Sequence, residues 1–137
     1  MASAGYSGTP LPQKLGIKEG HRVTILGTPK DFALGVLPGG VTVARGLTGK
    51  ALFDVIVAFV TRRVDLVARV TTCRPHMQQH AGLWIAWPKR ASGVATDITE
   101  DTIREVALPT GLVDNKVCAI DDVWSGLRLV IRKELRT

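Results

Sequence analysis

The fold of this chain is decided by residues 82–133, GLWIAWPKRASGVATDITEDTIREVALPTGLVDNKVCAIDDVWSGLRLVIRK. Along this stretch the apolar residues first alternate at the period of a strand, then recur at helical spacing, and then alternate again in two short runs. We therefore predict a strand, a basic loop, a helix, a strand, a tight turn and a strand, in that order. The succession of strand and helix predicts an α/β architecture.

Three features of this stretch support the assignment. Residues 83–87 are apolar on both alternations, which is typical of a strand covered on both faces. Thr99 is a favourable N-cap, acidic side chains follow it in the first helical turn, and Pro109 ends the helix. The last two predicted strands, 116–120 and 127–131, are separated by a connection short enough for an antiparallel hairpin.

The first half of the chain adds further strands at residues 23–26, 41–43 and 53–60, and the last of these is apolar on both faces. A helix is predicted from Thr61, as its N-cap, to Pro75. Parallel neighbours need a crossover of about a dozen residues, which the later connections provide. The sequence therefore predicts a mostly parallel open sheet with an antiparallel C-terminal strand pair. The strand at 41–43 is left with two alternatives, an edge position or an antiparallel orientation.

Length and composition indicate a single domain, because 137 residues with 45% hydrophobic and 22% charged side chains suffice for one compact core. We expect an N-terminal arm and short helix at residues 1–20 and one α/β domain at 21–137. The N-terminus lacks the features of an export signal, and the longest apolar run, 55–60, is far below the roughly 20 residues that span a bilayer. We therefore expect a cytoplasmic protein without a membrane partner, in which Cys73 and Cys118 are reduced thiols.

The formal net charge of +6 is unevenly distributed along the chain. Residues 1–70 carry nine Lys and Arg against four Asp and Glu, whereas residues 71–137 carry nine against eight. This asymmetry favours an anionic partner. Nucleic acid is one alternative, but the few aromatic residues leave little for a stacking platform, so we favour a small ligand. A protein-interaction subunit that uses a sheet edge is another alternative. The sequence makes no prediction about oligomeric state.

Two segments, FDVIVAFV at residues 53–60 and AGLWIAWPK at 81–89, together with the closing strand pair, resemble the C-terminal half of a Rossmann-like methyltransferase sheet. Such enzymes use a glycine-rich turn after the first strand and a carboxylate after the second to hold their cofactor. Here the turn at 27–31 has one glycine, and the second strand ends at Arg45, which only donates hydrogen bonds. The resemblance therefore implies the topology, and we predict no cofactor. A degenerate or unusual methyltransferase acting on S-adenosyl-L-methionine (SAM) is the alternative.

Four further motifs resemble a family of small bacterial proteins that is known only as a domain of unknown function. These motifs are GYSGTPL at residues 5–11, KLGIKEGHRV at 14–23, WPKRASG at 87–93 and GLVDNKVCAIDDVWSGLRLV at 111–130. They span nearly the whole chain. The family implies no known activity.

In open α/β sheets, ligands collect at the carboxyl ends of the parallel strands, where loops and helix N-termini converge. That rule predicts a basic rim formed by Lys30, Thr61, Arg62, Arg63, Lys89, Arg90 and Ser92. Gathered cations repel one another unless an anion neutralises them, although solvent and salt weaken the repulsion. We predict a non-enzymatic module that binds a small phosphorylated or nucleotide-like anion at this rim. A solvated basic surface without a ligand is the alternative.

The sequence predicts no catalytic residue and no metal ligand. His76 and His80 have the four-residue spacing of a helical metal site, with Cys73 upstream, but Pro75 interrupts the helix. We therefore expect solvated histidines at the end of that helix and a structural role for His21.

Overall fold

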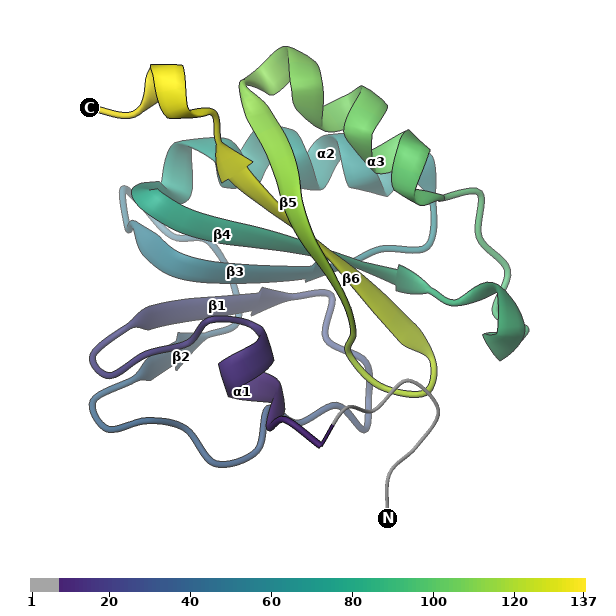
Figure 1. Cartoon of the computed structure of the whole chain (residues 1–137), viewed down its shortest axis with the longest axis horizontal. Coiled ribbons are helices and arrows are strands. Elements are labelled where there is room, and N and C mark those ends of the chain that lie inside the picture. The colour runs from purple at the N-terminus through teal and green to yellow at the C-terminus, as the bar shows by residue number, and fades with distance from the viewer. Residues whose placement is uncertain (1–7) are drawn as a thin grey trace.

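A computed structural model describes residues 8–137, so the first seven residues of the predicted arm lie outside the described part. Six strands form one sheet in the order β2-β1-β3-β4-β6-β5 (Figure 1). Their bounds are Arg22–Leu26 for β1, Thr42–Ala44 for β2, Phe53–Phe59 for β3, Met77–Pro88 for β4, Leu112–Ala119 for β5 and Trp124–Ile131 for β6. The helices are α1 at Leu11–Lys14, α2 at Arg63–Cys73 and α3 at Glu100–Ala107. Short 3₁₀ turns lie at Arg74–His76, Arg90–Ser92, Leu108–Thr110 and Lys133–Leu135.

The sheet is mostly parallel, as predicted. β1 pairs in parallel with both β2 and β3, and β3 pairs in parallel with β4. β6 is antiparallel to β4 and to β5, and it lies between them. β2 is an edge strand and runs parallel, so the first of its two predicted alternatives is confirmed.

The two faces of the sheet are covered in different ways. On one face, α2 and α3 pack through Leu66, Val70, Ile103 and Ala107, all of which are fully or almost fully buried. On the other face the chain has no helix between β1 and β2, and residues 27–41 pack there in extended and turn conformations. α1 and the residues after it complete this second layer (Figure 1). The second face is therefore covered by thinner structure than the first.

The structure explains why the central strands are apolar on both alternations: β3 and β4 contribute side chains to both clusters of buried residues. Trp84 is completely buried on the α1 side, and its indole Nε1–H donates to the carbonyl of Leu15 at 3.0 Å. A buried indole needs such a partner, and here the partner attaches the end of α1 to the middle of the sheet.

Four local predictions are wrong. β5 begins at Leu112 rather than at residue 116. Thr61 does not cap α2: the N-cap is Arg62, and the backbone N–H of Arg63 donates to Asp97 Oδ1 at 2.7 Å. β4 begins at Met77 rather than after Gly82, because Met77 already pairs with Phe53 of β3. A register shift separates this pair from the regular pairing that begins at Gly82. The hairpin turn is shorter than predicted, since the Asp121 carboxylate accepts from two backbone N–H groups and closes the turn before β6.

Helix α3 follows its prediction closely. Thr99 is the N-cap, and its hydroxyl and that of Thr102 form a reciprocal capping box. The left-handed conformation of Gly111, with φ of 86°, ends the turn after the helix. Among the described residues, no helix is both long enough and apolar enough to cross a bilayer.

Candidate functional site

The carboxyl ends of β1, β3 and β4 lie at one edge of the sheet because the three strands are parallel. The residues of the predicted rim follow these strands, but their side chains do not line one cavity. Lys30 and Arg62 are exposed, and neither lines the cavity that contains Thr61 or the one that contains Arg90. Thr61 lines a cavity beside β1, whereas Arg90 lines a separate cavity of about 760 Å³ after β4.

Three other members of the predicted rim have structural contacts. The Arg63 guanidinium pairs with Glu105 at 3.1 Å, which ties α2 to α3. Ser92 Oγ donates to the Lys89 carbonyl at 2.6 Å within a 3₁₀ turn, and the Lys89 backbone N–H donates to Val123. The Arg90 cavity also contains Asp97, Glu100 and Asp101, so its surroundings carry negative charge. The structure therefore does not bring all the predicted cations to one point.

Two adjoining cavities open beside α2 at this same edge, with volumes of about 490 and 510 Å³. Both are lined by Gly27, Arg69 and Thr72, while Thr61 and Asp65 line the first and Arg45 lines the second. We call their common surface the β1–α2 groove, defined by Gly27, Arg45, Thr61, Arg69 and Thr72. It lies at the point where the strand order reverses on either side of β1, which is the usual ligand position in open α/β sheets.

The groove carries two guanidinium groups that the predicted rim omitted. Arg45 follows β2 and its Nη1 approaches Thr28 Oγ1 at 3.3 Å, while Arg69 projects from α2. Neither makes an ion pair with another described residue. The sequence shows that Arg45 follows a strand. No local feature of the sequence indicates that Arg69 of α2 lines the same cavity.

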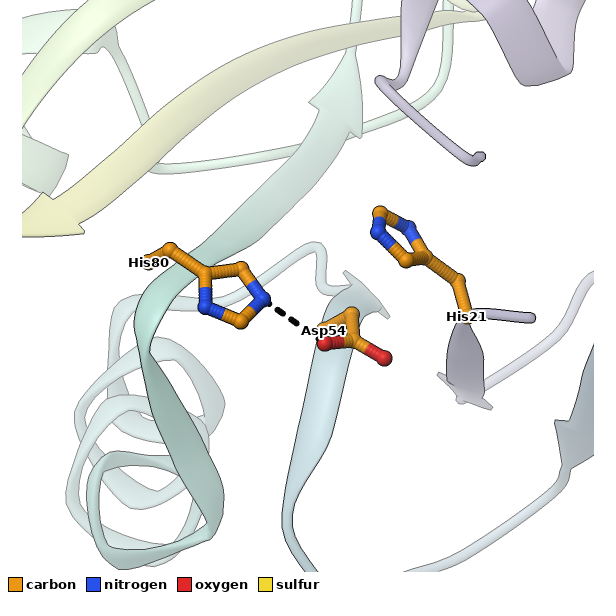
Figure 2. A group of neighbouring side chains, drawn as sticks. All are labelled: His21, Asp54 and His80. Carbon is orange, nitrogen blue, oxygen red and sulfur yellow. Dashed lines mark hydrogen bonds and ion pairs between the residues drawn. The ribbon is translucent and has the colours of Figure 1, made fainter. Parts of the chain in front are cut away.

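A second polar group lies at the amino-terminal edge of the sheet and joins three segments that are distant in sequence. His21 precedes β1, Asp54 lies at the start of β3, and His80 lies in the first part of β4 (Figure 2). One potential ligand atom from each residue lies within 4.8 Å of the others. His80 Nε2 is 2.7 Å from Asp54 Oδ1, and the two imidazole centroids are 6.3 Å apart.

This arrangement differs from the expectation for the helix-end histidines. His76 Nδ1 is 2.6 Å from the carbonyl oxygen of Ala51, so the two histidines at four-residue spacing do not converge. Cys73 is fully buried, and burial raises the pKa of its thiol to about 12. His80 instead lies beside His21, for which the sequence predicts a structural role.

Asp54 makes the hydrogen bonds that connect this group to β1 and β4. Burial is the largest single influence and raises the pKa of its carboxyl. The hydrogen bonds from the Arg22 backbone N–H and from His80, together with the positive charge that His21 and His80 carry when protonated, outweigh burial and bring the pKa below its ordinary value. Asp54 is therefore ionised at neutral pH.

Comparison with solved structures shows that the fold is similar to that of methyltransferases. No family model and no curated protein matches the chain, so its resemblance to the small bacterial family stays a prediction. A SAM-dependent methyltransferase from Aquifex aeolicus is similar in structure, with a TM-score of 0.63, 14% identity and 87% of each chain covered. A fibrillarin pre-rRNA processing protein from Methanococcus jannaschii gives a TM-score of 0.61 at 12% identity, covering 90% of this chain and 69% of that one. Aeropyrum pernix fibrillarin, with natively bound SAM, gives 0.56 at 16%, covering 92% and 70%.

The protein is thus a single-domain α/β protein with a Rossmann-like, methyltransferase-like fold. The residues of the groove do not match the glycine-rich turn and the acceptor carboxylate with which methyltransferases of this fold hold SAM. Gly27 is required by packing, since a Cβ there would lie 2.7 Å from the Phe59 carbonyl oxygen, and no helix follows it to receive a ligand. Arg45 lies where an acceptor for ribose hydroxyls is needed, and a guanidinium cannot accept.

Proposed function

We propose that this protein is a ligand-binding module on a methyltransferase-like fold, and that it binds a small phosphorylated or nucleotide-like anion in the β1–α2 groove. The observation that carries the proposal is the replacement of the expected acceptor by Arg45, with Arg69 lining the same groove. A guanidinium recognises phosphate and carboxylate oxygens through paired N–H donors.

The surroundings of the two arginines support this assignment. Thr61 lines the groove and its hydroxyl can donate to the same oxygens, whereas the Thr72 hydroxyl already donates to the Ala68 carbonyl oxygen at 2.9 Å within α2. Asp65 is the acidic residue of the lining and lies one helical turn before Arg69. Each half of the groove has a volume in the range of ordinary small-molecule sites, which is about 300–1,000 Å³.

The test is a thermal-shift titration of the full chain with ATP, ribose 5-phosphate and inorganic phosphate. A ligand at a hundred times its Kd stabilises a protein by about 2.7 kcal/mol, which raises Tm by several degrees. We expect Arg45→Ala and Arg69→Ala each to reduce that shift by more than half.

Two charge-matched variants serve as controls. Lys133→Ala removes an exposed cation in the C-terminal turn, far along the chain from the groove, and should leave the shift unchanged. Arg62→Ala removes a member of the originally predicted rim that does not line the groove. A shift that depends on Arg62 and not on Arg45 would return the site to the predicted rim, and no shift with any probe would contradict the proposal.

Methyl transfer is the second candidate function, and the structural similarity over 87% of both chains with the Aquifex aeolicus methyltransferase favours it. The test is isothermal titration with SAM and S-adenosyl-L-homocysteine, together with mass spectrometry of the denatured protein after purification from cells. Micromolar binding or a co-purified cofactor would support this function, and would show that Arg45 is compatible with a nucleoside ligand. Absence of both would leave the anion-binding module as the supported function.

A further inference from the structure

A separate cavity of about 390 Å³ lies on the face covered by α1, toward the amino-terminal edge of the sheet. We call it the α1 cavity, and its polar lining includes Lys18, His21, Asp54, His80, Lys116 and Arg128. Lys14 also contributes, so four cationic side chains face this space with one carboxylate among the described residues. The cavity does not share a lining residue with the β1–α2 groove and is independent of the function proposed above.

Each oxygen of the single carboxylate already accepts a hydrogen bond. Asp54 Oδ2 accepts from the Arg22 backbone N–H at 2.7 Å, and Oδ1 accepts from His80 Nε2 at 2.7 Å. The hydrogen bonds of Asp54 are therefore made to the β1 backbone and to His80, and none is made to Lys18, Lys116 or Arg128.

The same contacts determine where the histidine protons lie. An ionised carboxylate has no hydrogen to donate, so His80 Nε2 must carry the proton in its contact with Asp54. His21 Nδ1 accepts from the Lys18 backbone N–H at 3.1 Å, so a neutral His21 carries its proton on Nε2. His80 Nε2 and His21 Nε2 both carry protons, and the electron pair of His21 Nδ1 is used by the Lys18 backbone N–H.

A metal ion would therefore have to break these hydrogen bonds before it could be ligated by His21, Asp54 and His80, since metals bind deprotonated ring nitrogens. It would also enter a space lined by four cations. An oxyanion meets no such obstacle, because the groups that line the cavity are predominantly hydrogen-bond donors.

Arg128 and Lys116 are positioned by contacts other than ion pairs. Arg128 is partly buried beside Gly82, where any Cβ would collide with its guanidinium, and its Nη1 has Asn115 Oδ1 as a distant partner at 3.4 Å. Lys116 Nζ is 3.4 Å from the Lys14 carbonyl oxygen. Within the described part, Lys18, Lys116 and Arg128 form no ion pair.

We propose that the α1 cavity binds the phosphate group of a small phosphorylated molecule. The phosphate dianion offers several acceptor oxygens and matches three unpaired cations and the His21 Nε2–H that surround the space. A volume of about 390 Å³ exceeds what a phosphate alone would fill and leaves room for a small organic portion.

The proposal is tested by isothermal titration of the full chain with inorganic phosphate and with ribose 5-phosphate at low salt. Lys116→Gln and Lys18→Gln are the informative variants, because both side chains are exposed and their replacement should leave the fold intact. We expect each to weaken binding of ribose 5-phosphate about tenfold, as the loss of a charge-assisted hydrogen bond predicts. Lys133→Gln is the matched control and should have no effect.

Two outcomes would overturn the proposal. One is binding that Arg45→Ala abolishes while Lys116→Gln and Lys18→Gln leave it unchanged, which would assign the phosphate to the β1–α2 groove. The other is the absence of phosphate binding together with tight binding of Zn²⁺ that His80→Ala removes, which would assign a metal to this cluster. Long-range ¹⁵N NMR of the imidazoles adds a direct check, because the proposal requires the proton of His21 on Nε2.

Discussion

Asp54 shows how one side chain connects separate strands at the residue scale. Its carboxylate accepts hydrogen bonds from the start of β1 and from the first part of β4, while its own backbone belongs to β3. The side chain is only 15% exposed, so these two donors replace most of the water that an ionised carboxylate requires. Because the contacts favour the charged form, they stabilise the fold only while Asp54 is ionised.

Asp54→Asn should therefore lower the free energy of unfolding at pH 7 by about 1.5–3 kcal/mol, the typical value of a hydrogen bond to a charged group. The pKa of Asp54 in the folded protein lies below its ordinary value of 3.8. Its contribution is thus complete above that pH and is lost as the pH falls through the folded-state pKa. Urea denaturation of both proteins at pH 7 and pH 3 measures this, and a difference that stays the same at pH 3 would contradict it.

At the scale of elements, the N-terminus of α2 is stabilised from outside the helix. The helix begins after Arg62, whose side chain provides no cap, and Asp97 from the connection between β4 and α3 accepts the Arg63 backbone N–H instead. A carboxylate at this position satisfies a backbone donor and also interacts favourably with the helix dipole. The loop before α3 therefore helps to fix α2, and Thr96 strengthens the contact by donating to the Thr61 carbonyl at 2.6 Å.

We expect Asp97→Ala to cost about 1 kcal/mol of stability, a typical value for the loss of an N-cap. The matched control is Thr61→Ala, because Thr61 was the cap predicted from the sequence and its hydroxyl has no hydrogen bond described in the structure. Guanidinium denaturation with a constant m-value gives both free energies. An equal or larger loss for Thr61→Ala would show that the predicted cap operates in solution.

For the whole molecule, the distinctive feature is the unequal cover of the two faces. Two helices protect one face, whereas α1 and the segment at 27–41 protect the other, and the α1 cavity lies beside α1 on this second face. Leu15 is 1% exposed and belongs to the core of this second face, so the short helix is part of the folding unit. The segment 8–20 is thus packed against the sheet that follows it.

Leu15→Ala should destabilise the protein by about 2–4 kcal/mol, because it removes a buried side chain and leaves a cavity. Val36→Ala is the control: Val36 lies on the same face but is 94% exposed, so its loss should change stability by no more than about 0.5 kcal/mol. Differential scanning calorimetry should show a single transition in each case. A separate low-temperature transition, with the main one unchanged by Leu15→Ala, would show that α1 folds apart from the sheet.

The predicted and observed folds agree where the determining interactions are local. The two-sided apolar runs of β3 and β4, the Thr99 cap of α3 and the closing hairpin are all specified by residues close together in the chain. The start of β4 was missed because residues 77–81 include three polar side chains, and their strand conformation depends on pairing with β3.

By itself, then, the sequence determined the class of fold, the order of the elements and the excess of positive charge, since periodicity, capping and composition are properties of neighbouring residues. Only the tertiary structure decided which charges meet. Arg45 and Arg69 line one groove, and Lys18, Lys116 and Arg128 surround a cavity at the other edge, although each group is assembled from distant segments. Such meetings depend on strand register and on how each connection crosses the sheet, and both are set by long-range packing.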